Sequence, residues 1–305
     1  MLHTPSGVSV GAARVDRNSP IHQLAASRLA LSFSADETTG RTRMHVNTQE
    51  PPWRVIRAFP QSNGSSLVHL HNVSGGILAG DHLSLDLRVG RDCIAQVTST
   101  GATRLYRHRQ DSHDSEQHVQ IHVEENALLE YLPDTLIPFA GSRHRQRTSI
   151  HLADQATLFW WETLAPGRLH MGETFAFEKL HVQTAIRSPR KPLFLDDFVL
   201  QPTSRPLASA ARLGGYTHMA CFYACKVGTP PTVWRDLESQ LNVLCVTRSQ
   251  PGAIIWGATT LVADGIAVRG LSVSACDIPA TLHDCWKIAR RFLTGTEAVP
   301  PRKVY

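Results

Sequence analysis

Two carboxylates lie within strongly apolar stretches of the chain, where an acidic side chain has chemical consequences. Glu130 stands among apolar residues in the segment 128–132, and Glu162 follows the apolar segment 158–161. A buried carboxylate needs hydrogen bonds, an opposite charge or a bound cation. A carboxylate that strand alternation turns toward solvent needs none of these. Because each neighbouring segment is apolar on both faces, the two alternatives stay open for both residues.

A glycine-rich segment, residues 72–81, ends in another carboxylate, Asp81. Gly75, Gly76 and Gly80 join two stretches that alternate as strands do. Glycine is favoured where the backbone takes a positive φ or passes close to another group. A phosphate-binding P-loop would continue with Lys and Ser or Thr and would open a helix, and this segment does neither. We therefore predict a fixed turn in which Asp81 accepts backbone N–H groups, in preference to binding a metal.

A histidine pair, His69 and His71, shares one face of an expected strand, with a spacing of roughly 7 Å along the chain. With a third ligand the pair could hold a transition metal, so a β-rich metal-dependent enzyme is the alternative functional class. We favour ordinary contacts with neighbours or water for both side chains. No Gly-x-Ser-x-Gly elbow surrounds Ser74, and the sequence contains no His-Glu-x-x-His segment; these are the signatures of α/β-hydrolases and zinc proteases. The residues alone therefore give no strong enzyme signature.

The elements that must position these residues are mostly strands. From about Ser27 to Leu200 the hydrophobic pattern has a period of two, as Leu85, Leu87 and Val89 show. This period is typical of half-buried strands. Many short strands separated by turn signals predict a mainly β protein, with a sandwich or an extended β-helix-like body. Other candidate strands cover residues 53–59, 128–132 and 173–181.

Helical signals are confined to the C-terminal third of the chain, where we expect about two helices. A short helix opens at Pro230, and a strand is expected over 243–247. The clearest helix covers about 279–293, because its apolar residues recur at spacings of three and four. Asp277 is placed to cap this helix and Gly295 to end it.

Length and composition predict one β-rich domain over residues 27–305, preceded by a loose N-terminal arm over residues 1–26. No apolar run approaches the roughly 18 residues of a membrane span, and the N-terminal residues lack the pattern of a secretory signal. The six cysteines are scattered, without a Cys-x-x-Cys pair. Buried, reduced thiols in a cytoplasmic protein are therefore favoured over a disulfide framework.

The net charge of +5 raises the question of an acidic partner. A nucleic-acid binder could use Arg104, Arg107, Arg143 and Arg145, and its affinity would depend steeply on salt. However, Tyr106 alone lies between two of these arginines, and no series of exposed aromatic residues interleaved with them is evident. A basic balance also fits an acidic protein surface, and solvated strand faces explain the arginines more simply. We therefore expect neither a nucleic-acid nor a membrane partner.

Several short boxes, taken together, resemble one known family, the urease accessory protein UreD, called UreH in some organisms. They include Val-Ser-Gly-Gly-x-x-x-Gly-Asp, a threonine-rich stretch, Leu-Glu-Tyr-Leu-Pro-Asp, Trp-Glu, Pro-Gly-Arg, Gly-Glu-x-Phe and a C-terminal Pro-Pro-Arg. Each box alone is weak, but their shared order over most of the chain, from about Leu29 to Tyr305, is specific. The boxes lie at residues 73–81, 97–106, 129–134, 137–141, 161–162, 166–168, 172–175 and 300–302.

The resemblance implies a non-catalytic scaffold with a β-helix-like body. Such a protein assembles with a helical partner, UreF, and a GTPase, UreG, on urease apoprotein, and helps deliver nickel to the urease active site. It implies transient nickel and no tightly bound cofactor, since a conduit needs weak, exchangeable ligands. The candidate nickel ligands are Glu130, Asp134, Glu162 and, fourth, Asp81. The candidate partner contacts are Trp286, Phe292, Pro301 and Arg302.

Overall fold

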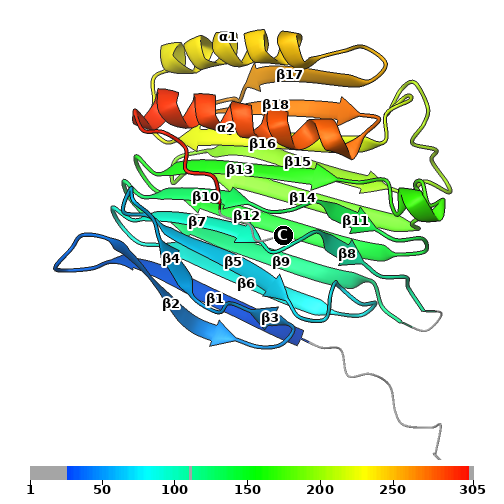
Figure 1. Ribbon diagram of the computed structural model, residues 1–305, viewed down its shortest axis with the longest axis horizontal. Helices are drawn as coiled ribbons and strands as arrows, with labels where there is room; N and C mark the ends of the chain where they lie inside the picture. Colours follow the sequence, from blue (N-terminus) through cyan, green and yellow to red (C-terminus); the bar gives the residue numbers. More distant parts are fainter. Residues whose placement is uncertain (1–25, 110–111, 302–305) are drawn as a thin grey trace, which may run out of the picture.

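Alternating apolar residues produce strands with one buried face. In β6 (His82–Val89), Leu83, Leu85, Leu87 and Val89 are buried, whereas the residues between them reach the surface. The computed structural model describes residues 26–109 and 112–301. It is mainly β, as predicted, with its strands in two sheets and its two α-helices in the C-terminal third (Figure 1).

The seven-stranded sheet has the order β15-β14-β12-β9-β6-β1-β2. Its central strands pair in parallel, and β2 and β15 add antiparallel edges. The bounds beyond β6 are β1 Ala26–Ala35, β2 Thr42–Gln49, β9 Ser115–Val123, β12 Arg143–Leu152, β14 Lys179–Arg187 and β15 Pro192–Leu200.

The eleven-stranded sheet has the order β17-β18-β16-β13-β10-β7-β5-β3, with β4, β8 and β11 paired beside this path. Here β5, β7, β10 and β13 are parallel. The bounds are β3 Trp53–Arg54, β4 Ala58–Pro60, β5 Ser66–Asn72, β7 Ile94–Ser99, β8 Thr103–Leu105, β10 Leu128–Leu132, β11 Leu136–Pro138, β13 Thr157–Leu164, β16 His218–Lys226, β17 Ile254–Thr260 and β18 Gly265–Ser272.

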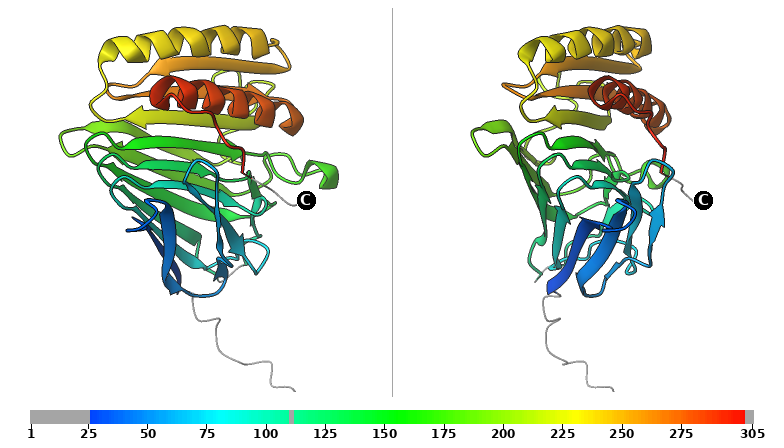
Figure 2. Two further views of the ribbon diagram at one scale, coloured as in Figure 1. Left: turned by 60° about the vertical axis from the view of Figure 1, so that its left-hand side comes forward. Right: turned by 90° about the vertical axis from the view of Figure 1, so that its left-hand side faces the viewer.

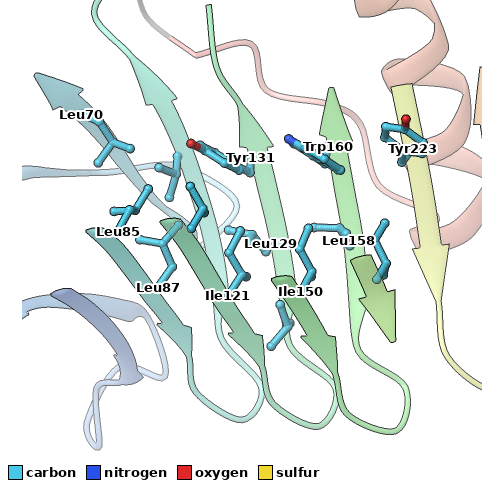
Figure 3. Packing of buried hydrophobic residues seen from close by; sticks show 14 of the residues in the cluster. Leu70, Leu85, Leu87, Ile121, Leu129, Tyr131, Ile150, Leu158, Trp160 and Tyr223 are labelled. Atoms are coloured by element: carbon cyan, nitrogen blue, oxygen red, sulfur yellow. The ribbon is translucent and has the colours of Figure 1, made fainter. Parts of the chain in front are cut away.

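The parallel strands arise because the chain coils alternately through the two sheets, from β5 to β6, β7, β9, β10, β12, β13 and β14. This course confirms the predicted β-helix-like body. Apolar side chains from both sheets pack against one another between them. In Figure 3, Leu85, Ile121 and Ile150 of the seven-stranded sheet face Leu129 and Leu158 of the other sheet.

Helices α1 (Pro231–Arg248) and α2 (Ile278–Thr294) form a third layer. Both pack on the eleven-stranded sheet and lie on its side of the molecule (Figure 2). Trp234 and Leu237 of α1, and Leu282 and Trp286 of α2, join a second buried cluster with residues of that sheet. Two short 3-10 turns, η1 (Leu169–Met171) and η2 (Ala275–Asp277), complete the elements.

The predicted strand over Val243–Thr247 is wrong, because these residues continue helix α1. Their β-branched side chains favour strands by propensity. The buried stripe of α1 nevertheless continues with helical spacing through Leu241 to Cys245, and this burial outweighs the propensity. Val243 and Val246 lie on the exposed side of the helix.

The predicted helix over 279–293 is confirmed as α2, and Gly295 ends it with a φ of 68°. The predicted cap at Asp277 is wrong, because its side chain makes no capping hydrogen bond. Two predicted strands are also shorter than expected. Residues 53–59 split into β3 and β4, and the strand expected from residue 173 begins only at Lys179.

The six cysteines are free, and Cys93, Cys225, Cys245 and Cys285 are buried, as predicted for most of the thiols; Cys276 is exposed. Neither described helix is long and apolar enough to cross a membrane. The predicted N-terminal arm lies outside the described residues apart from Ala26, the first residue of β1. The division into an arm and one domain therefore stays a prediction.

Candidate functional site

The glycine-rich segment between β5 and β6, residues 72–81, forms the predicted fixed turn. Gly75 and Gly80 have φ values of 78° and 82°, which side chains rarely tolerate. The backbone N–H of Leu78 donates to Asp81 Oδ2 at 2.8 Å. Burial raises the pKa of Asp81, and this hydrogen bond acts in the opposite direction. Asp81 thus has the turn-stabilising contact that the sequence favoured.

Gly76 serves a different purpose in the same turn, because the next coil of the chain passes directly over it. A Cβ atom at Gly76 would lie 2.5 Å from the carbonyl oxygen of Arg104 and 2.6 Å from the ring of Tyr106. The backbone of Ile77 bonds this coil on both sides: its N–H donates to Arg104, and its carbonyl accepts from Tyr106. Glycine is required here by the close approach of another backbone.

Successive turns continue this stack along one edge of the molecule. The rings of Tyr106 and Phe139 meet edge to face at 5.2 Å, and the Arg168 guanidinium lies 4.2 Å from the centre of the Phe139 ring. Arg168 also pairs with Glu173, and Glu173 Oε2 accepts from the backbone of Ala140 at 3.1 Å. We call Tyr106, Phe139, Arg168 and Glu173 the turn stack; cation–π and charge-assisted contacts hold its members in place.

Gly76→Ala should destabilise the protein by about 1–3 kcal/mol, because the added methyl group overpacks a site closed by backbone. Gly101→Ala is the matched control, because nothing lies within 4 Å of a Cβ at that position. It should change the stability by less than about 0.5 kcal/mol. Thermal unfolding of the two variants checks this. Equal melting temperatures would contradict the close approach at Gly76.

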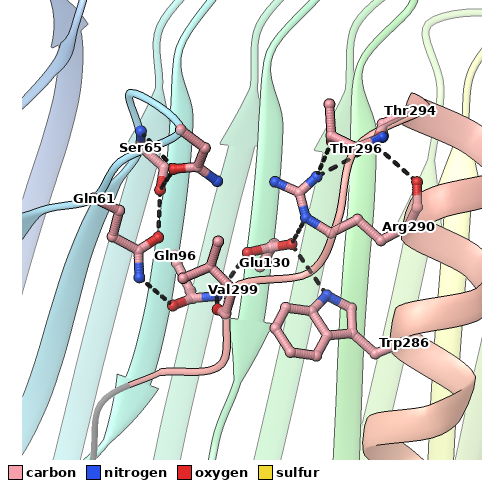
Figure 4. Close-up of polar contacts among 10 residues, drawn as sticks. Gln61, Ser65, Gln96, Glu130, Trp286, Arg290, Thr294, Thr296 and Val299 are labelled. Carbon is pink, nitrogen blue, oxygen red and sulfur yellow. Dashed lines mark hydrogen bonds and ion pairs between the residues drawn. The ribbon is translucent and has the colours of Figure 1, made fainter.

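Glu130 lies at the centre of a buried polar cluster, where its carboxylate has a complete set of partners (Figure 4). The Arg290 Nε atom lies 2.8 Å from Glu130 Oε1, and both side chains are 1% exposed. This contact is an ion pair without hydrogen-bond alignment. Trp286 Nε1 donates to Oε1 at 3.0 Å, and Gln96 Nε2 donates to Oε2 at 2.7 Å. Burial raises the pKa of Glu130, and the Arg290 charge opposes this shift.

The same cluster, which we call the Glu130 cluster, also fixes the C-terminal segment. Arg290 Nη1 donates to the hydroxyl groups of Thr294 and Thr296, at 3.3 Å and 2.7 Å. Gln96 Nε2 donates to the carbonyl oxygen of Val299 at 2.9 Å. The carboxylate on β10 therefore joins β7, α2 and the segment that follows α2.

A cavity of about 750 Å³ lies between the sheets, and Asp134 and Glu162 are among its lining residues. We call it the interior cavity. Its walls are largely apolar, with Trp160, Val182 and Phe198 among the lining side chains. A largely apolar cavity with a few polar groups is typical of a binding site.

The carboxyl group of Glu162 lines this cavity and has a strongly raised pKa. Burial raises its pKa to about 8, and the Asp196 charge acts in the same direction. Gln146 Nε2 donates to Glu162 Oε1 at 3.2 Å, and no described cation pairs with Glu162 within salt-bridge distance. The side chain keeps some exposure toward the cavity, so water there reduces the size of the shift without reversing it.

The raised pKa of Glu162 predicts a stability that depends on pH. A carboxyl group whose pKa rises from 4.5 to about 8 on folding stabilises the protein below pH 4.5, and this contribution is lost as the pH rises through 8. The side chain of Glu162→Gln cannot titrate. When the pH rises from about 5.5 to about 8.5, the melting temperature of the wild type should therefore fall relative to that of the variant. A difference that is constant over this range would contradict the raised pKa.

Glu130 and Glu162, two of the candidate nickel ligands, lie on opposite faces of the eleven-stranded sheet. Glu130 points to α2, whereas Glu162 points into the interior cavity. Asp134 lies at the cavity wall and accepts from Ser99 Oγ at 3.0 Å. Asp81 is not among the cavity-lining residues. The cavity therefore brings together two of the four candidate carboxylates.

Sequence reasoning missed Asp196, Cys221 and Arg269, which also line the interior cavity. Arg269 Nη2 donates to Asp196 Oδ2 at 2.8 Å, and burial raises the pKa of the Cys221 thiol to about 12. Asp196 and Asp197 are consecutive in β15, so one of them must face inward. The two consecutive aspartates were therefore a signal in the sequence for a cavity carboxylate, but they do not show which of the two faces inward.

The histidine pair lies in β5, at the partly exposed end of the strand. The ring of His69 meets Phe59 edge to face at 5.6 Å. Burial and the nearby His69 lower the pKa of His71. Among residues 26–109 and 112–301, no group of three His, Cys, Asp or Glu side chains could hold a metal ion. The alternative of a metal enzyme at His69 and His71 thus lacks a third ligand there.

The candidate partner contacts have different surroundings. Trp286 is fully buried and donates to Glu130, so the expectation of a partner contact at Trp286 is wrong for the folded chain. Phe292 packs partly against the helical core cluster, and Pro301 is partly exposed. Arg302 lies outside the described residues.

With this geometry established, comparison with known proteins decides the family. A family model described as UreD urease accessory protein matches residues 25–305. The chain belongs to the UreD family. It is 41% identical over 277 residues to urease accessory protein UreD of Herpetosiphon aurantiacus, a match that covers 91% of this chain and 96% of the relative.

More distant members of the UreD family match as well. Urease accessory protein UreD of Pseudomonas paraeruginosa is 32% identical over 274 residues, which are 90% of this chain and 92% of the relative. Urease accessory protein UreH of Helicobacter acinonychis is 29% identical over 191 residues, covering 63% and 71% of the two chains. The resemblance found in the sequence is thereby confirmed. In this UreD-family chain, the boxes around Gly76, Tyr106, Phe139 and Arg168 meet in consecutive turns at one edge.

Proposed function

We propose that this chain is a non-catalytic scaffold of urease maturation in the cytoplasm. It joins a UreF-like protein and a UreG-like GTPase on urease apoprotein and helps deliver nickel to the urease active site. Nickel is its cargo and binds only in transit, and no cofactor is tightly bound. Membership of the urease accessory family supports this proposal, and the interior cavity is the observation that carries it.

The interior cavity offers ligands suited to a cation in transit. Asp134 and Glu162 supply carboxylate oxygens at its wall, and since no three described His, Cys, Asp or Glu side chains form one metal centre, an ion would meet them singly. Carboxylates are weaker nickel ligands than a histidine or thiolate cage, and the ion can leave them again. Because the pKa of Glu162 lies at about 8, a proton competes with the metal near neutral pH. Nickel passage should therefore be faster at mildly alkaline pH.

The helical layer is the surface that we assign to a UreF-like partner. On α1, Val243 and Val246 are 67% and 77% exposed. Neighbouring apolar side chains on an exposed helix face are typical of protein–protein contacts. Phe292 of α2 remains a proposed contact of this layer, and Pro301 and Arg302 remain proposed partner contacts at the C-terminal end of the chain.

Co-expression with the urease genes tests the proposed function. A tagged chain should retain urease apoprotein, a UreF-like protein and a UreG-like GTPase in a pull-down, and its removal should abolish urease activation. A chain that retains none of these proteins, or cells that activate urease equally well without it, would overturn the proposal. Substrate turnover by the isolated chain with bound metal would favour the enzyme alternative.

A further inference from the structure

The outer face of the seven-stranded sheet is not covered by either of the described α-helices. Helices α1 and α2 pack on the other sheet, and no described helix lies outside β6, β9, β12 and β14 (Figure 2). Sheets of parallel strands are usually covered on both faces. Here the outer face carries polar and charged side chains, and these allow it to remain uncovered.

Arginine and histidine side chains form a row across this outer face. Strand register places Arg88, His122, His151 and Arg187 side by side on β6, β9, β12 and β14. The two histidine rings stack with centres 4.8 Å apart and an angle of 6° between their planes. Four adjacent strands at about 4.8 Å spacing span roughly 14 Å, so the row has an arginine at each end of that width.

Two more arginines extend the positive surface along β12. Arg145 and Arg147 point to the same side, and two-residue spacing in a strand is roughly 7 Å. Both are exposed, as are Arg88 and Arg187. None of these four arginines forms an ion pair within residues 26–109 and 112–301. We call Arg88, Arg145, Arg147 and Arg187 the arginine face.

The carboxylates on and beside this face form their ion pairs with other basic groups, although the charge of Arg147 also contributes to the lowered pKa of Asp197. The ion pairs are Arg28–Asp86, Arg143–Asp114, Lys179–Asp114 and His181–Asp197, and Glu116 lies near His82 and His118. The remaining charge on the face is therefore positive. An unpaired arginine attracts a carboxylate in particular, since the guanidinium can bind it through two parallel hydrogen bonds.

We propose that the arginine face binds an acidic surface of a protein partner in the urease assembly; this proposal rests on the proposed function. A protein is favoured over a nucleic acid for two reasons. The carboxylates interspersed on the face would repel a polyphosphate, whereas a protein can present basic groups opposite them. The outer residues of β6, β9, β12 and β14 also include no Phe, Tyr or Trp on which single-stranded bases could stack.

Charge reversal tests the arginine face. The variant Arg145→Glu/Arg147→Glu changes two exposed residues that make no ion pair with the described part of the chain. Its control, Arg54→Glu/Arg205→Glu, makes the same charge change at exposed positions outside this face and outside the helical layer. Purified urease apoprotein, the UreF-like protein and the UreG-like GTPase serve as probes, each measured at low and high salt after nuclease treatment. Circular dichroism and melting temperature should match the wild type for both variants.

The face variant should bind one of the three partners about tenfold more weakly at low salt, with a smaller difference at high salt. The control variant should bind as the wild type does. Unchanged binding of all three partners by the face variant, with wild-type binding intact, would overturn this inference and leave the proposed function standing. Binding that disappears on nuclease treatment would overturn it in favour of a nucleic acid. A wild-type chain that binds none of the partners would refute the proposed function itself.

Discussion

Replacement of Glu130 by leucine should lower the free energy of unfolding by about 3–5 kcal/mol, because it leaves a buried arginine without its counter-charge. Arg290 is 1% exposed and pairs with Glu130 at 2.8 Å. The same substitution removes the acceptor for Trp286 and one acceptor for Gln96. The position of α2 and of the segment after it depends on these contacts. We therefore expect a lower melting temperature and a smaller soluble fraction.

Two further variants separate the charge from the packing at the Glu130 cluster. Glu130→Leu/Arg290→Met removes both charges and should recover part of the lost stability, since replacing both partners of a buried pair is far less harmful than replacing one. The exposed pair Arg28–Asp86 provides the control, and Asp86→Asn should cost no more than about 1 kcal/mol. A Glu130→Leu protein as stable as Asp86→Asn would contradict the assigned role of the cluster.

Glu162→Gln should reduce nickel delivery to urease on the order of tenfold, the scale expected when a group that supports metal binding is lost, without breaking up the complex. The substitution keeps the size of the side chain and removes the negative charge at the wall of the interior cavity, which attracts the nickel ion under the proposed function. Its effect should grow as the pH rises toward 8, where the wild-type carboxyl group ionises. Nickel content of urease, measured by elemental analysis after reconstitution, checks this prediction.

Glu124→Gln is the matched control for Glu162→Gln, because Glu124 is exposed and outside the cavity lining. This variant should deliver nickel as the wild type does. Asp134 is the other candidate nickel ligand that lines the cavity. Asp134→Asn should therefore also reduce nickel delivery. Unchanged nickel delivery by both Glu162→Gln and Asp134→Asn would show that the cavity carboxylates take no part in nickel delivery. Glu130 variants are unsuited to this test, because their effect on stability would dominate.

The sequence predicted the β-rich body well, because strands such as β6 alternate regularly between buried and surface residues. It could not predict which strands pair, since the coiling between two sheets depends on contacts between distant residues. Helix α1 shows a second limit. The β-branched residues after Leu241 favour a strand locally, and only packing against the sheet reveals the helical stripe that ends at Cys245.

The candidate site was predicted in part. The environments of Glu130 and Glu162 remained open in the sequence because their neighbours are apolar on both faces, and alternation then carries no information about direction. In the structure, Glu130 pairs with Arg290, whereas Glu162 lines the interior cavity. Arg290 could not be recognised as the partner of Glu130, because a sequence does not show which of its 31 basic residues will be buried.

The most direct test of the account is the nickel content and activity of urease apoprotein reconstituted with and without this chain. Purified apoprotein, nickel, bicarbonate, GTP, the UreF-like protein and the UreG-like GTPase are combined in both reactions. The account predicts nickel-loaded, active urease when the chain is present and little loading when it is left out. Equal nickel content and activity in the two reactions would contradict it.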